Sequence, residues 1–476
     1  MLKKKVKSIS FYIFAFPVYA IKIMSKRIFL FLAGICCFFN VQSQDASDYD
    51  LKKCIAYALE NSYLNTSDKI DADERYAAYK TAKTKILPQV DFYLDYYNYF
   101  NDLPTYIFPA EEGNILSGGS STGPYPVGLG LPHNLNAGLD IKQVIFDRNF
   151  ILTDDLERNL AKLDQLKNQL SQETIIYDVT LNYYKLASLY AKKELMQYNI
   201  ERLVRISEQV DVQIANGYAR SFDKGKIEIN MTKILTGIDQ LNAGIEQLEG
   251  YIKFLMGMPV ETDINIVIEE MELKPGQISE DYPDSLANTE QELLDTKIDL
   301  YELDKERIKS DHFLKLNAFA RFRLQAQREA FNFFEGNQDW FLINMFGVRL
   351  DIPIYRGGER KKKMEASSIK SDRVRLDKIR LQESLKMQFE NARIELINSL
   401  SNIEYSRKNV ETSKGMYEQT TALYKEGLVM LSELLEVESA YREAENNLIT
   451  AQYGYKIAEL NYLKATGNLL TYSEDL

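Results

Sequence analysis

Hydrophobic positions follow two different periods along this chain, and the two periods occur in the same order twice. Four segments alternate apolar and polar residues at every second position, which predicts strands with one apolar and one polar face. Their alternating parts are roughly nine to eleven residues long, the length that a tilted strand needs to cross a bilayer. We expect these strands at about 89–100, 135–146, 315–326 and 341–355.

Long helical patterns follow each pair of strands. From residue 434 to 465, apolar residues recur in alternating steps of three and four, and from 389 to 424 a bulky residue recurs every seven positions beside small residues. Large side chains facing small ones predict a closely packed antiparallel helical hairpin. The same steps run with three misses from 156 to 198, inside a predicted helix of about 147–216 that would be about 100 Å long.

The spacing of glycines indicates an internal duplication. Gly217 and Gly427 lie 210 residues apart, and so do Gly257 and Gly467. A repeated unit of strands followed by a helical hairpin therefore predicts one body built from two similar halves. Each half also starts with a helix, the first of them at 50–86 and ended by Leu87-Pro88. We expect a first repeat at 44–257, a linker or equatorial segment at 258–285, a second repeat at 286–467 and a short polar tail at 468–476.

The N-terminal segment is typical of an exported protein. A charged stretch before residue 28, an apolar stretch at 28–39 and small residues up to Ser43 predict a signal peptide at 1–43. Residues 1–23 are either an extension of this signal or precede a true start at Met24. Cys54 would then be the single remaining cysteine, which excludes an intrachain disulfide. No later run of 18 apolar residues occurs, so a membrane span would have to consist of strands. Four strands cannot enclose a lumen, and open edges are not tolerated in lipid, so we expect an oligomer.

Composition and motifs exclude several other functions. The chain is 27% charged and 45% hydrophobic, and its net charge of −11 with scattered cations gives no basic surface for nucleic acid. His133 and His312 have no Cys, His or carboxylate at ligand spacing, and no phosphate-binding loop motif occurs. We therefore expect no metal, no cofactor and no enzymatic activity. Glu433 and Glu436 follow the turn at Gly427, where the pattern fits either a channel lining or a solvated helix face.

Six segments carry a resemblance to a known family: Leu51 to Asn61, Leu87-Pro88, Asp351 to Gly358, Tyr424 to Leu428, Leu434 to Glu436 and Leu463 to Gly467. Taken in this order and duplicated, they resemble the TolC-type outer membrane efflux proteins, and the resemblance covers essentially the whole mature chain. The resemblance implies a mainly α protein with a small membrane β part. A trimeric twelve-stranded β-barrel, with four strands per chain, would stand on a long antiparallel coiled-coil α-helical barrel, internally duplicated.

The family implies a function and partners. The protein would be a homotrimer in outer membrane lipid with a long periplasmic helical extension. It would act as the passive export duct of a tripartite efflux or type I secretion system, opened by a periplasmic adaptor (membrane fusion protein) and an inner-membrane pump. The sequence indicates neither the cargo nor the class of pump.

The resemblance also implies roles for individual residues. The turns that touch the adaptor would be Gly217, Tyr218, Ala219, Gly427, Leu428 and Val429. The acids that narrow the aperture would be Glu433 and Glu436, with Asp223 as the one acid at a matching position of the first copy. The barrel lumen would be lined by Asp91, Asp95, Arg321, Arg323, Arg349 and Asp351.

The chain departs from the family at one point and leaves one alternative. Leu314-Lys315 stands where the family commonly has Leu-Pro, so the start of the third strand stays open. The alternative function is a periplasmic coiled-coil adaptor or scaffold. Such a protein would need one hairpin and a small lipoyl-like or barrel module, whereas this sequence predicts two hairpins and four amphipathic strands.

Overall fold

The computed structural model forms two units, which are described separately. The smaller unit contains β1 (Asp48–Tyr49) and β6 (Asn265–Ile266), which pair in parallel. The larger unit contains all other elements. The predicted signal peptide, Tyr218 and most of the predicted linker lie outside the described residues. The structure describes residues 48–100, 103–108, 125–217, 219–268, 288–336 and 338–475.

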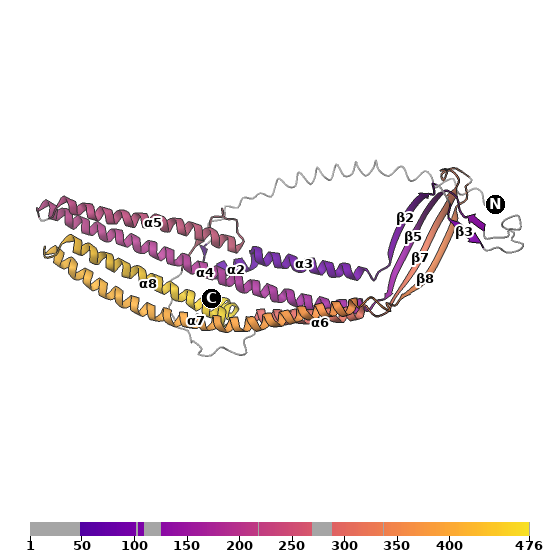
Figure 1. Cartoon of the computed structure of the whole chain (residues 1–476). Helices are drawn as coiled ribbons and strands as arrows, with labels where there is room; N and C mark the ends of the chain where they lie inside the picture. Colours follow the sequence, from indigo (N-terminus) through magenta and orange to yellow (C-terminus); the bar gives the residue numbers. More distant parts are fainter. Residues whose placement is uncertain are drawn as a thin grey trace. The chain divides into compact units, whose positions relative to one another are not determined.

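Four strands of the larger unit form one antiparallel sheet in the order β2-β5-β7-β8 (Figure 1). The third of them begins at Lys315, and the fourth ends at Asp351, short of the expected 355, because Pro353 has no N–H to donate. A separate hairpin of β3 (Thr105–Phe108) and β4 (Tyr125–Gly128) was not indicated by the sequence pattern. The sheet strands are β2 (Gln89–Asn98), β5 (His133–Phe146), β7 (Lys315–Arg328) and β8 (Phe341–Asp351).

Two long antiparallel helical hairpins follow the strands. The first consists of α4 (Arg148–Ala215) and α5 (Ser221–Met256), and the second of α7 (Glu359–Lys425) and α8 (Leu431–Ala465). Helix α4 has 68 residues, which corresponds to about 100 Å. The shorter α6 (Thr289–Ser310) packs against both α4 and α7. Because α4 follows β5 and α7 follows β8, both hairpins leave the same end of the sheet (Figure 1).

The single helix predicted at 50–86 is wrong, because the chain forms two helices there, α2 (Leu51–Asn61) and α3 (Tyr63–Thr84). The side-chain oxygen of Ser62 accepts a hydrogen bond from the backbone N–H of Asn65 at 3.3 Å and so caps a new helix. Gly257 packs directly against this break, where a Cβ would collide with the backbone of Asn61. The alanine-rich pattern predicted a continuous helix because a single serine within it is a weak signal for a cap.

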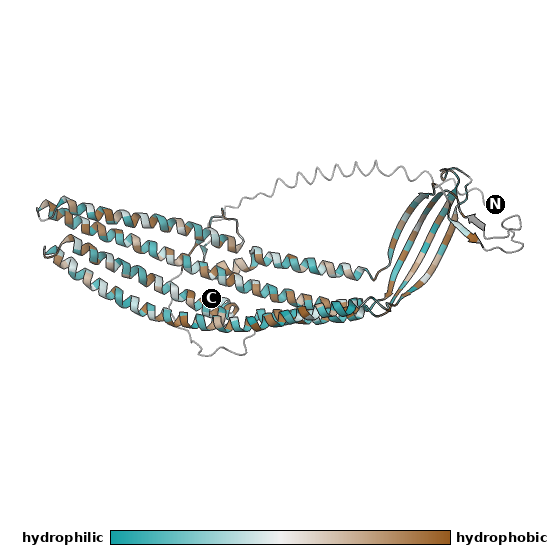
Figure 2. Cartoon of the chain, in the orientation of Figure 1, coloured by the Kyte–Doolittle hydropathy of each residue, from teal (hydrophilic) through white to brown (hydrophobic). Residues whose placement is uncertain are grey.

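The helices pack through the predicted alternation of large and small side chains. Hydrophobic and hydrophilic residues alternate along the long helices in Figure 2. In the second hairpin, Phe389 and Ala392 of α7 meet Tyr455 and Ala458 of α8. Near the hairpin turns, one core cluster joins all four long helices. It contains Leu203, Ile206, Val210, Ile227, Ile234, Tyr424, Leu431, Leu434 and Leu435, and is called the tip core below.

The C-terminal segment is helical. The segment predicted as a polar tail forms α9 (Leu469–Asp475), in which Leu469 is buried and the Tyr472 hydroxyl lies 2.8 Å from that of Tyr184 on α4. Within the described ranges, no helix is both long and apolar enough to cross a membrane.

Candidate functional site

One face of the four-stranded sheet is apolar and exposed. Strand pairing places Phe92 beside Leu139, and Leu139 beside Phe322, so the apolar residues of neighbouring strands form continuous rows. Phe346 is 72% exposed and Val348 is 69% exposed. Monomeric soluble proteins rarely expose contiguous apolar patches beyond a few hundred Å². This face is called the apolar sheet face, and its exposed members are Val90, Phe92, Leu94, Tyr96, Leu139, Leu324, Phe346, Val348 and Leu350.

The opposite face is mainly polar, apart from Phe341, Ile343 and Met345 of β8, and contains all six residues predicted to line a lumen. It is called the polar face. The pairing register sets Asp91, Asp140 and Arg321 side by side on three strands. The Arg321 guanidinium lies 3.6 Å from Asp140, and Lys142 lies 3.9 Å from Asp91. Sequence reasoning placed Asp140 and Lys142 on the polar face but did not select them, because the partners that pair with them depend on strand register.

Two more contacts lie on the polar face, one of which reaches from β7 to β2 across Gly138 of β5. The guanidinium of Arg323 donates a hydrogen bond to the Tyr93 hydroxyl at 3.1 Å. Arg349 pairs with Asp351 at 2.9 Å on the same strand. The polar face therefore carries charges of both signs.

Two glycines allow aromatic rings to lie flat on the polar face. The Tyr93 ring covers Gly138, where a Cβ would be 2.8 Å from the tyrosine hydroxyl, and the Phe319 ring covers Gly347, where a Cβ would be 2.5 Å from the ring. Both pairs are cross-strand neighbours. Because glycine has no side chain to pack, the aromatic ring fills the space above it.

The sheet is open at both sides. Within the described residues, β2 pairs with β5 alone and β8 pairs with β7 alone, so their outer edges carry backbone N–H and C=O groups without a strand partner. Such edges are templates for pairing with another chain. In a lipid environment each unpaired group would cost several kcal/mol, so an open edge requires a partner there.

The hairpin turns use left-handed glycines, Gly217 with a φ of 79° and Gly427 with a φ of 76°. After Gly427, the backbone N–H of Leu428 donates to the carbonyl of Leu423 at 2.9 Å, which closes the helix end. Ala219 and Val429 both pack against the tip core, so the two turns lie next to each other. Leu428 is 67% exposed.

The three predicted aperture acids differ in their contacts. Glu433 and Glu436 are exposed, lie one turn apart at the start of α8, and form no ion pair within the described part of the chain. Asp223 accepts a hydrogen bond from the backbone N–H of Arg220 at 3.4 Å and pairs with Lys226 at 3.3 Å. Asp223 therefore stabilises the first turn of α5, a contact that Glu433 and Glu436 lack.

A buried charged cluster lies between the hairpins and was missed from sequence. The Arg202 guanidinium of α4 lies 2.8 Å from Glu445 and 3.9 Å from Glu438, and Arg442 lies 3.6 Å from Glu438. These residues and the Tyr441 ring, 4.4 Å from the Arg202 guanidinium carbon, are called the Arg202 cluster. The Glu438 side chain is 1% exposed.

The environment of the Arg202 cluster changes two pKa values. Burial raises the pKa of Glu438, and the cations of Arg442 and Arg202 oppose this effect. Burial and a hydrogen bond to Glu445 raise the pKa of Tyr441 to about 12. The cluster links α4 to α8, and therefore links the two halves of the chain.

Comparison with known proteins finds a family match over part of the chain and a shared fold over most of it. A family model described as outer membrane efflux protein matches residues 308–468. The crystal structure of the Campylobacter jejuni CmeC outer membrane channel is similar with a TM-score of 0.67 at 14% identity, over 88% of this chain and 85% of that one. Among curated protein sequences, none matches the chain.

Two further solved structures have the same architecture. The Vibrio cholerae outer membrane protein VceC is similar with a TM-score of 0.65 at 12% identity, over 88% of this chain and 96% of that one. The open state of the Neisseria gonorrhoeae MtrE outer membrane channel is similar with a TM-score of 0.63 at 15% identity, over 88% of this chain and 89% of that one. The predicted resemblance to TolC-type outer membrane efflux proteins is therefore confirmed, by the family match in the second repeat and by a fold shared with outer membrane channels.

Proposed function

We propose that this chain is one protomer of a homotrimeric outer membrane channel. Three sheets of four strands would join, β2 of one copy beside β8 of the next, into a twelve-stranded barrel. The observation that carries the proposal is an open sheet with two unpaired edges and one exposed apolar face. Joining the edges between copies pairs every outer N–H and C=O group, which a lipid environment requires.

The two sheet faces give the barrel its inside and outside. The apolar sheet face meets lipid, because a charged side chain at the middle of a bilayer costs roughly 2–4 kcal/mol on the lipid side of a barrel. The polar face lines the lumen, where Arg321, Asp140 and Arg323 stay hydrated. The long hairpins continue this lumen as a duct in the periplasm.

The channel exports solutes passively, in a tripartite efflux or type I secretion system. A periplasmic adaptor docks on the hairpin turns, and an inner-membrane pump supplies the energy. Exposed apolar side chains at these turns support an interface with another protein: Phe222 is 73% exposed, Leu428 67% and Met430 77%. The paired hairpins and the four-stranded sheet favour a channel over the alternative of a periplasmic adaptor or scaffold.

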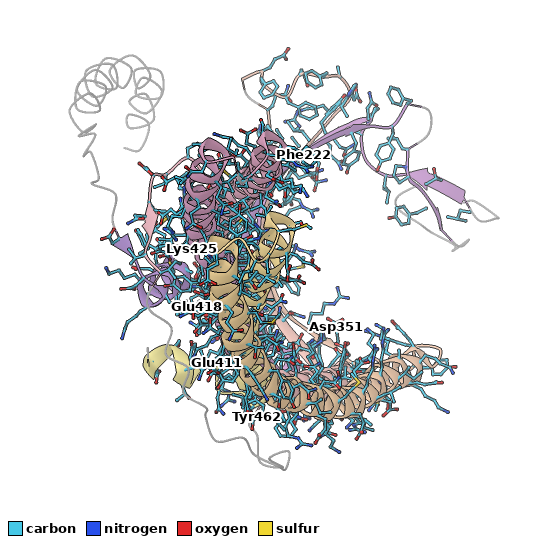
Figure 3. The ribbon with its side chains drawn as sticks, turned by 90° about the vertical axis from the view of Figure 1, so that its left-hand side faces the viewer. Phe222, Asp351, Glu411, Glu418, Lys425 and Tyr462 are labelled. Atoms are coloured by element: carbon cyan, nitrogen blue, oxygen red, sulfur yellow. The ribbon has the colours of Figure 1, made fainter. Side chains whose placement is uncertain are left out.

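The residues Glu433 and Glu436 narrow the periplasmic end of the duct. Three copies bring six carboxylates together, and a ring of acids favours cations. The double variant E433Q/E436Q is therefore expected to lower cation selectivity, measured as the reversal potential across a salt gradient in planar bilayers. The control E411Q/E418Q removes the same charge from exposed positions of α7 that are not among the predicted aperture acids (both are labelled in Figure 3).

The test of the proposed function is single-channel conductance of the purified full-length protein. We expect discrete conductance steps in planar bilayers and recovery of the expressed protein in the outer membrane fraction. A protein that fractionates with the soluble periplasm and produces no conductance would refute the proposal. An equal loss of cation selectivity in E433Q/E436Q and in E411Q/E418Q would refute the assignment of the aperture alone.

A further inference from the structure

The junction between β8 and α7 carries a concentration of positive charge. Although the chain has a net charge of −11, five of the eight residues from 356 to 363 are Arg or Lys. Two glycines in left-handed conformation, Gly357 and Gly358, turn the chain here, and α7 begins at Glu359. The five cations are Arg356, Arg360, Lys361, Lys362 and Lys363.

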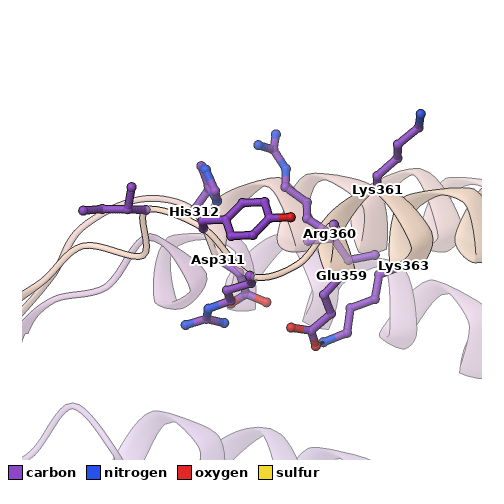
Figure 4. Close-up of a pocket in the computed structure, with 11 residues that line it drawn as sticks. Asp311, His312, Glu359, Arg360, Lys361 and Lys363 are labelled. Atoms are coloured by element: carbon purple, nitrogen blue, oxygen red, sulfur yellow. Dashed lines mark ion pairs between the residues drawn. The ribbon is translucent and has the colours of Figure 1, made fainter.

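Only part of this charge is neutralised within the chain. Lys363 pairs with Glu359 at 2.7 Å, and Lys362 pairs with Glu365 at 2.8 Å. No ion pair within 4 Å links the other three cations, Arg356, Arg360 and Lys361, to an acid in the described ranges. Figure 4 shows Glu359 and Lys363 together on one side of α7, while Arg360 and Lys361 point away from them.

The cations act electrostatically on Glu359, which lines the junction together with a second acid, Asp311. The hydrogen bond from Lys363 lowers the pKa of Glu359, and the charge of Arg356 lowers it further. Because Glu359 is paired with Lys363 and Asp311 is paired with Lys315, the charges of Arg356, Arg360 and Lys361 remain available to an anion from outside the chain.

A pocket of about 290 Å³ lies at this junction, and its lining combines apolar residues, cations and the two acids Asp311 and Glu359. Ile308 and the exposed Ile354 and Tyr355 form its apolar part, beside His312. Ile354 is 88% exposed and continues the row of even-numbered apolar residues from β8. That row, Val348, Leu350, Ile352 and Ile354, leads from the apolar sheet face to the cations.

We propose that this junction binds an anionic phospholipid. The acyl chains lie along Val348, Leu350 and Ile352, and the phosphate is held by Arg356, Arg360 and Lys361. A guanidinium presents paired N–H donors to phosphate oxygens, and each Lys or Arg near an anionic lipid surface adds to the attraction. The inference rests on the proposed function, because it requires lipid against the apolar sheet face.

A free phosphate ion would use the same cations but not the apolar row. The row and the pocket are continuous, which favours a molecule that has both an anionic head and apolar chains. The position of the pocket also suits a lipid headgroup, because the pocket lies where the apolar sheet face ends and the polar helices begin. Cations at such a boundary extend their charged ends to the headgroup region.

The test measures lipid binding by the full-length protein in detergent, with native mass spectrometry during titration by dioleoylphosphatidylglycerol or dioleoylphosphatidylcholine. We expect the anionic lipid to bind roughly tenfold more tightly than the zwitterionic one, about 1.4 kcal/mol. The triple variant R356Q/R360Q/K361Q should lose most of this preference. The control R407Q/K408Q/K414Q removes the same charge from exposed positions elsewhere on α7 and should keep it.

Two further measurements keep the result interpretable. The single variant I354S, at an exposed position, should weaken binding of both lipids, and 10 mM inorganic phosphate should not displace the anionic lipid. If the triple variant does not assemble, K361Q is compared with K408Q in the same titration. Displacement by phosphate, or equal lipid preference in the cation variant and its control, would overturn the proposal.

Conductance recorded from the same preparations separates this inference from the proposed function. A conducting trimer without lipid preference contradicts the lipid site and leaves the channel intact. A protein that neither assembles nor conducts contradicts the channel itself.

Discussion

Removing Arg202 should destabilise the contact between the two hairpins. Arg202 is the cation of α4 that faces Glu445 at 2.8 Å and Glu438 at 3.9 Å, and its side chain is 11% exposed. The variant R202M keeps much of the side-chain volume but leaves two carboxylates of α8 without this partner. Breaking a buried ion pair from one side costs about 3–5 kcal/mol. We expect about 3 kcal/mol, since Arg442 still lies 3.6 Å from Glu438.

This free energy corresponds to a measurable change in thermal midpoint. Unfolding entropy is about 2.1 cal/mol/K per residue, so roughly 430 residues give about 0.9 kcal/mol/K. A loss of about 3 kcal/mol then lowers the midpoint by about 3 °C, which circular dichroism of the detergent-solubilised protein at pH 7 can resolve. The control R407M changes an exposed arginine of α7 and should shift the unfolding free energy by less than about 0.5 kcal/mol.

A double variant distinguishes electrostatics from packing. In R202M/E438Q the buried charge that lost its partner is also removed, so part of the lost stability should return relative to R202M. The coupling free energy between the two positions is then obtained from the four proteins of the cycle. Equal midpoints for R202M and R407M, or a double variant less stable than R202M, would refute the role of the Arg202 cluster.

Three further predictions follow from individual contacts. Because burial raises the pKa of Glu438, its folded form binds a proton more tightly than the unfolded chain, and stability is lost as pH rises above the ordinary value of 4.5 through the raised pKa. E438Q should therefore gain stability over the wild type between pH 5 and pH 8 in thermal melts, and a constant difference would contradict this. G347A should cost about 1–3 kcal/mol because its Cβ meets the Phe319 ring, while the helical control G415A, with open space around it, should be neutral or stabilising. R321Q should increase cation preference in reversal-potential measurements, because Asp140 loses its cation, and an unchanged potential would argue against a lumen position.

The faces of the sheet could be predicted from sequence, whereas its contacts could not. Side chains of a strand point alternately to its two faces, so the sequence alone puts Arg321 and Asp91 on the polar faces of their own strands. The pairing of Arg321 with Asp140 depends on a register between strands that are far apart in sequence. The glycine at 347 is informative only once Phe319 is known to lie beside it.

In the helices, too, packing that depends on local residue spacing could be predicted from sequence, whereas contacts between distant segments could not. Heptad spacing predicted that Phe389 and Tyr455 lie in a packed seam, and the structure shows them in one cluster. Glu438 looks like a surface acid in sequence, since its burial requires Arg202 from a helix of the other repeat. The break at Ser62 was missed because one serine in a helical pattern is a weak signal until its hydroxyl is seen to cap α3.

The central claim is that each chain supplies one third of a membrane-spanning wall. The most direct measurement is the mass of the complex extracted from outer membranes into mild detergent, determined by native mass spectrometry. The account predicts a species with three times the mass of the mature chain, which dissociates to single chains on heating. A stable, water-soluble single chain that does not associate with detergent or lipid would contradict it.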